Sequence, residues 1–65
     1  MFINIELERV RRRMTKAEMA CRLQISSGML DDWIHRRKAI PASKLRALSQ
    51  LFTGVSLDYL LMERR

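Results

Sequence analysis

A chain of 65 residues is long enough for one domain with a small core, which leaves little room for an enclosed catalytic cavity. Its 13 lysines and arginines outnumber its 7 aspartates and glutamates, and the net charge of +6 makes nucleic acid a more natural partner than an acidic protein or an anionic membrane. The single cysteine, Cys21, cannot form an internal disulfide, and no apolar run is long enough for a secretory signal or a membrane span. We therefore expect a single-domain, cytoplasmic protein that is not an enzyme.

The first predicted helix runs from about Ile3 or Asn4 to Arg13. Apolar residues recur there at spacings of three and four, as they do along the rest of the chain, so we expect an all-helical protein. The predicted inward face of this helix consists of Ile3, Leu7, Val10 and Met14. The arginines from Arg9 to Arg13 surround the other side, where they either bind phosphate or form a solvated helix face.

The second predicted helix begins at the segment "TKAE", which has the form of a capping box between Thr15 and Glu18. It ends near Gln24, and Ser26 is well suited to cap a third helix after a short turn. The inward stripe of the second helix consists of Met19, Ala20 and Leu23. The two helices therefore follow each other closely along the chain.

The third predicted helix has one apolar side and one polar side when positions advance by 100° per residue. The apolar side is expected to contain Leu30, Trp33, Ile34 and Arg37, with Trp33 as the anchor in the core. The opposite side displays Ser27, Gly28, Met29, Asp31, Asp32, His35 and Arg36. That polar side is the surface that a partner would contact.

A basic connection then leads to a fourth helix, with Pro41 in its first turn, and Gly54 ends this helix. Ser56 is predicted to cap a short fifth helix. The inward residues of the fourth helix are Leu45, Leu48, Leu51 and Phe52. The apolar residues of the fifth are Leu57, Leu60 and Leu61.

Two short helices joined by a tight turn and followed by further helices form the helix-turn-helix pattern. Four segments that cover nearly the whole chain resemble the Cro/C1-type, or xenobiotic-response-element, helix-turn-helix domains of phage and mobile-element repressors. These segments are "ERVRRRMTKAEMACRLQIS", "LDDWI", "IPASKLRALSQLF" and "VSLDYLL". The resemblance implies a compact five-helix bundle of the lambda-repressor-like type, with the helix-turn-helix at about residues 15–36.

The resemblance also implies a function, namely repression of transcription by a homodimer that binds a pseudo-palindromic operator in double-stranded DNA. Dimerisation would use the C-terminal helices. The positions that read bases match Ser27, Gly28 and Asp32, to which the exposed side of the helix adds Met29 and Arg36. The phosphate-binding positions match Lys16, His35 and Arg37, to which Thr15 at the start of the second helix and Lys38 in the basic connection are added as candidates.

Two positions depart from the family's pattern. The family often has glycine in the turn after the second helix, where this chain has Gln24, and after the third helix, where it has Arg36. Gln24 is therefore expected in a left-handed backbone conformation, at some energetic cost, unless the turn differs.

Asp31 and Asp32 stand out on the exposed side of a helix in a basic chain. Asp32 could accept a hydrogen bond from cytosine in the major groove. Alternatively, Asp32 orients Arg36 and Asp31 orients His35, since each pair is four residues apart on a helix, and Arg36 then contacts guanine or phosphate. A third interpretation is that the aspartates weaken DNA binding in a chain adapted to bind protein.

Other chemistry lacks its sequence signals. His35 and Cys21 have no partners at metal-ligand spacing, and there is no nucleophile elbow or glycine-rich phosphate loop, so we expect no metal, cofactor, small-molecule ligand or catalysis. The main alternative function is a protein-interaction module of the same fold, an antitoxin-like protein or adaptor with weak DNA binding. Its surface would be the apolar C-terminal segment "YLLM", because so short a helix cannot bury Leu57, Leu61 and Met62 on one face.

Overall fold

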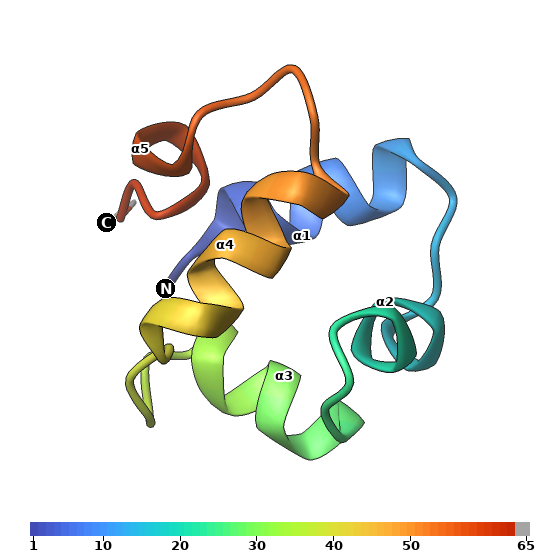
Figure 1. The fold of residues 1–65 in the computed structure, drawn as a ribbon, viewed down its shortest axis with the longest axis vertical. Helices are drawn as coiled ribbons and strands as arrows, with labels where there is room; N and C mark the ends of the chain where they lie inside the picture. Colours follow the sequence, from blue (N-terminus) through green and yellow to red (C-terminus); the bar gives the residue numbers. More distant parts are fainter. Residues whose placement is uncertain (64–65) are drawn as a thin grey trace.

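A computed structural model describes residues 1–63 of the protein, and these residues form five helices and no strands (Figure 1). The predicted all-helical fold is confirmed. The helices are α1 (Ile3–Arg11), α2 (Lys16–Arg22), α3 (Ser27–Ile34), α4 (Ala42–Leu51) and α5 (Leu57–Leu60). In Figure 1, α4 crosses in front of α1, α2 and α3 lie together at one end of the molecule, and α5 lies at the opposite end near both termini.

The predicted helix starts are confirmed by hydrogen bonds at their first turns. The Thr15 hydroxyl accepts from the backbone N–H of Glu18, and the Glu18 carboxylate accepts from the backbone N–H of Thr15, both at 3.1 Å, which completes the capping box. The hydroxyls of Ser26 and Ser56 cap α3 and α5 in the same way, each at 3.1 Å. Pro41 stands one residue before α4, at its N-cap position, rather than within the first turn.

Three helices are followed, two positions after their last residue, by a residue in the left-handed backbone conformation, and none of the three is glycine. The φ angles are 57° at Arg13, 57° at Gln24 and 60° at Arg36. After α2, the N–H of Gln24 donates to the carbonyl oxygen of Cys21 (3.0 Å) and that of Ile25 donates to Ala20 (2.9 Å), which is the hydrogen-bond pattern of a Schellman motif. The left-handed conformation expected at Gln24 is therefore confirmed.

The core lies where the four longer helices meet. Trp33 is 2% exposed, so its predicted role as a core anchor is confirmed. The other buried apolar residues are Ile5, Met14, Met19, Ala20, Leu23, Leu30, Ile34, Leu48, Phe52 and Leu60. Leu57 and Leu61 are half-buried and Met62 is 52% exposed, so α5 does leave apolar surface uncovered, as its length predicted.

The predicted inward face of α1 is wrong at Leu7 and Val10, although Met14, which follows the helix, is buried as predicted. Leu7 is 45% exposed and Val10 is 61% exposed, whereas Asn4 and Glu8 are buried beside Ile5. The helix also ends at Arg11, two residues earlier than predicted. Apolar spacing alone indicated the wrong face because the polar side chains of α1 have partners on distant elements.

Tyr59 of α5 supplies those partners. The Asn4 side-chain amide donates to the Tyr59 carbonyl oxygen (2.8 Å), and the Tyr59 hydroxyl donates to the Glu8 carboxylate (3.1 Å). Arg12 also bonds to Glu8 and lies over the ring of Phe52, 4.9 Å from its centre. These hydrogen bonds make burial of the polar face of α1 energetically acceptable, since a buried carboxylate is tolerated only when it is paired. They also show that Arg12 is not a freely solvated side chain.

Candidate nucleic-acid interface

The candidate site is the polar side of α3, which we call the outer face and define by Ser27, Gly28, Asp31, Asp32 and His35. Ser27, Gly28 and His35 are exposed, and the two aspartates are half-buried under neighbouring basic side chains. The outer face exists because Leu30, Trp33 and Ile34 hold the opposite side of α3 in the core. At its N-terminal end, Ser26 caps the helix and Gly28 presents only backbone, so a partner can approach closely there.

The two aspartates of the outer face gather four basic side chains around them. Asp31 accepts hydrogen bonds from Lys16 Nζ (3.1 Å) and Arg37 Nη2 (2.6 Å), and Asp32 accepts one from Arg37 Nε (2.8 Å). His35 Nδ1 lies 3.4 Å from the Asp31 carboxylate, and Lys38 Nζ lies 3.8 Å from Asp32. These six residues, which come from α2, α3 and the segment after α3, are called the aspartate network below.

The ion pairs shift the protonation equilibria of their members. Lys16, and to a smaller extent Arg37, lower the pKa of Asp31 below its ordinary value. In return, Asp32 first and Asp31 second raise the pKa of Arg37. Asp31 and Arg37 therefore keep their charges at neutral pH. The cations of the network are held in place, but they are also partly neutralised by the aspartates that hold them.

The predicted pairing of Asp31 with His35 is confirmed, and the predicted pairing of Asp32 with Arg36 is wrong. The Arg36 guanidinium bonds to Glu63 and lies over the ring of Phe2, 5.4 Å from its centre, so it points away from the outer face. The reason is the left-handed backbone at Arg36, which ends the 100° periodicity of α3. The same turn brings Arg37, which helical spacing had placed on the core side, over both aspartates.

The remaining residues predicted to contact DNA differ in how accessible they are to a partner at the outer face. Met29 is half-buried and packs against the core, so only part of it is accessible from the outer face. Thr15 is exposed, but its hydroxyl and its N–H are both used by the capping box with Glu18. Of the predicted phosphate-binding residues, the structure brings Lys16, His35, Arg37 and Lys38 together.

Lys44 supports the outer face in a way that the sequence did not suggest. Its ammonium group donates to the Leu23 carbonyl oxygen at the end of α2 (2.7 Å), so α4 braces the turn between α2 and α3. The two residues are 21 positions apart, and no local spacing rule relates them.

Other kinds of site find little support in residues 1–63. No three His, Cys, Asp or Glu side chains of this segment are arranged to hold a metal ion. Its longest helix, α4, has 10 residues, and no helix of the segment meets the length and apolarity of a membrane span. Comparisons of the chain with models of protein families, with curated proteins and with solved structures find no match.

Proposed function

We propose that this chain is a sequence-specific, double-stranded DNA-binding transcriptional regulator of the lambda-repressor-like helix-turn-helix type. In this proposal it acts as a repressor, by occupying a pseudo-palindromic operator as a homodimer. The observation that supports it best is an exposed α3 with Ser27 and Gly28 uncovered and with Lys16, Arg37 and Lys38 beside it. An α-helix with its side chains is about 10–12 Å in diameter, so α3 fits across the major groove, which is ~12 Å wide.

Binding to DNA would exchange partners within the aspartate network. Lys16, Arg37 and Lys38 are at least two-fifths exposed and can turn from the aspartates to backbone phosphates. Exposed ion pairs of this kind contribute little to stability, so the exchange costs little. Asp32, once released by Arg37, is then able to accept a hydrogen bond from cytosine.

Dimerisation through the C-terminal helices agrees with the apolar surface near the chain ends. Met62 is 52% exposed and Met1 is 42% exposed, and the terminal ammonium group of Met1 lies 3.3 Å from Glu63. Both ends of the described chain therefore contribute exposed apolar side chains to this side of the molecule. A second copy of the chain would remove both from water.

A protein-interaction module of the same fold remains the second candidate. The observation that favours this second candidate is that both aspartates lie on the outer face, where they already neutralise part of the nearby positive charge. On this alternative, DNA binding would be weak and strongly dependent on salt.

Selection of random duplex DNA by the full chain, at two salt concentrations, tests the proposal. Enrichment of a two-fold symmetric site at both concentrations is the expected result. Arg37→Ala should weaken binding to every duplex. It should also reduce the steepness with which log K falls as log salt concentration rises (the salt slope) by about one unit. Ser27→Gln should instead change the preferred bases. If no site is enriched and all binding disappears at the higher salt concentration, the proposal fails and the second candidate gains support.

A further inference from the structure

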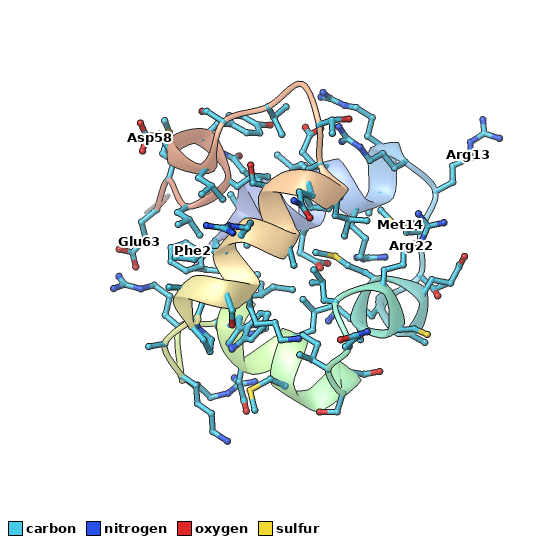
Figure 2. All side chains as sticks on the ribbon, in the orientation of Figure 1. Phe2, Arg13, Met14, Arg22, Asp58 and Glu63 are labelled. Atoms are coloured by element: carbon cyan, nitrogen blue, oxygen red, sulfur yellow. The ribbon has the colours of Figure 1, made fainter. Side chains whose placement is uncertain are left out.

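A groove lies between the start of the chain, the connection from α3 to α4, and the segment after α5. Its volume is about 320 Å³. Phe2, Ile40, Leu45 and Leu61 give it an apolar floor, and Arg36 and Lys38 stand at its rim. Figure 2 shows Phe2 and Glu63 close together on this side of the molecule. The groove is therefore separate from Ser27 and Gly28, the exposed start of α3.

The chain's own C-terminal segment indicates which chemistry fits this groove. Leu61 contributes to its apolar wall, and two residues later the Glu63 carboxylate bonds to Arg36. The side chains of Arg36 and Glu63 are nevertheless 51% and 47% exposed, so this contact is open to competition from another carboxylate. Lys38, whose side chain is 60% exposed, also lines the groove, while its ammonium group lies 3.8 Å from Asp32 in the aspartate network.

We infer that this groove binds a short acidic segment of a partner protein, which inserts one aliphatic or aromatic side chain and places a carboxylate on Arg36. The partner's carboxylate takes the position that Glu63 occupies in the free protein. We choose this partner for its charge complementarity, because an apolar floor beside the Arg36 guanidinium matches an apolar side chain close to a carboxylate. The volume is near the lower limit of about 300 Å³ for ligand pockets, which suits one anchoring side chain rather than a large enclosed ligand.

The backbone at Arg36 creates this arrangement. Its left-handed conformation, with φ of 60°, directs Arg36 toward the groove and Arg37 toward the aspartate network. Two consecutive arginines thus serve two different surfaces. Arg37 is absent from the groove lining, whereas Lys38 lines the groove and also pairs with Asp32, so Lys38 is shared by the two surfaces.

Selection from a phage-displayed library of random seven-residue peptides by the full chain tests this inference. We expect enrichment of peptides with an aliphatic or aromatic residue within two positions of Asp or Glu. For the best enriched peptide, Arg36→Gln should weaken binding about tenfold or more, as expected for the loss of one charge-assisted hydrogen bond. Glu63→Gln should strengthen binding, because it removes the internal competitor.

Arg46→Gln is the matched control, because it makes the same change in charge on α4 at an exposed residue outside the groove lining. It should leave peptide binding unchanged. Glutamine at position 36 keeps a side chain on the left-handed residue, so no backbone strain is relieved, and circular dichroism checks that the variant folds. If Arg36→Gln does not fold, Lys38→Gln, at an exposed residue of the same rim, is expected to weaken peptide binding instead.

Three results would overturn the inference. The first is enrichment of no peptide, or of peptides without acidic residues. The second is equal loss of binding in the Arg36→Gln and Arg46→Gln variants, which would indicate nonspecific attraction to a basic protein. The third is displacement of the peptide by dodecanoate or by a single-stranded oligonucleotide at lower concentration than by the unlabelled peptide, which would assign the groove to a different ligand.

Discussion

Replacement of Gln24 by glycine is expected to stabilise the protein. Gln24 has a φ of 57°, and a residue with a Cβ atom in this conformation costs about 1–2 kcal/mol. Its side chain is exposed and makes no hydrogen bond within residues 1–63, so the substitution removes strain without removing a contact. Glycine also gives the unfolded chain more freedom, which offsets about 0.4–1 kcal/mol of the gain.

The net gain is therefore about 1 kcal/mol, which corresponds to a rise in Tm of roughly 4–8 °C for a domain of this size. Thermal and urea denaturation, followed by circular dichroism, would measure it. Gln50→Gly is a matched control, because Gln50 is an exposed residue of α4 in the right-handed helical region. There the same substitution should lower stability by about 0.5–1 kcal/mol.

A Gln24→Gly variant that is no more stable than the original chain would refute this argument. Equal destabilisation by both substitutions would have a specific meaning, namely that Gln24 is in an ordinary helical conformation. The turn between α2 and α3 would then differ from the one described, and so would the position of the outer face relative to α2.

Three further predictions concern the core, the candidate interface and the response to acid. Trp33→Ala should cost about 3–5 kcal/mol and leave little cooperative unfolding in calorimetry, and a cooperatively folded variant would contradict the central position of Trp33. If the outer face binds DNA, Asp31→Asn should increase the affinity for any duplex, because it releases Lys16 and Arg37 from Asp31. The salt slope should become steeper by about 0.9 for each of these cations that then contacts a phosphate. Asp58→Asn on α5 makes the same change in charge and should have a smaller effect. Arg12 lowers the pKa of Glu8 in the folded protein. The ionised Glu8 therefore stabilises the fold at neutral pH. This stabilisation is lost as the pH falls below the pKa of glutamate in the unfolded chain, about 4.3, and through the lower pKa of Glu8 in the folded protein. Chemical denaturation at pH values on either side of this range should show a smaller loss for Glu8→Gln than for the original chain, and an equal loss would rule out Glu8 as a source of acid sensitivity.

The sequence by itself determined the number of helices, their starts and most of the core. Thr15, Ser26 and Ser56 marked the starts because a cap depends only on residues two or three positions away. The stripes of α2 and α4, and that of α3 except for Arg37, were also correct, since in those helices the buried face and the apolar face coincide.

Tertiary structure decided which face of α1 is buried. Asn4 and Glu8 are turned inward, where the Asn4 side-chain amide N–H and the Glu8 carboxylate each bond to Tyr59, which is 55 and 51 residues away along the chain. No pattern within one helix contains that information. Apolar spacing therefore selected Leu7 and Val10, which the structure leaves exposed.

Tertiary structure also decided which partners the basic residues around α3 have. One of three interpretations of the sequence was that Asp31 and Asp32 hold basic side chains, and helical spacing correctly paired Asp31 with His35. It could not indicate that Lys16 crosses from α2, or that Arg36 turns toward Glu63 and leaves Arg37 to the aspartates. Caps and stripes follow from residues within a turn or two of each other, whereas the partners of long charged side chains depend on how the helices pack and on where a left-handed residue ends the helical periodicity.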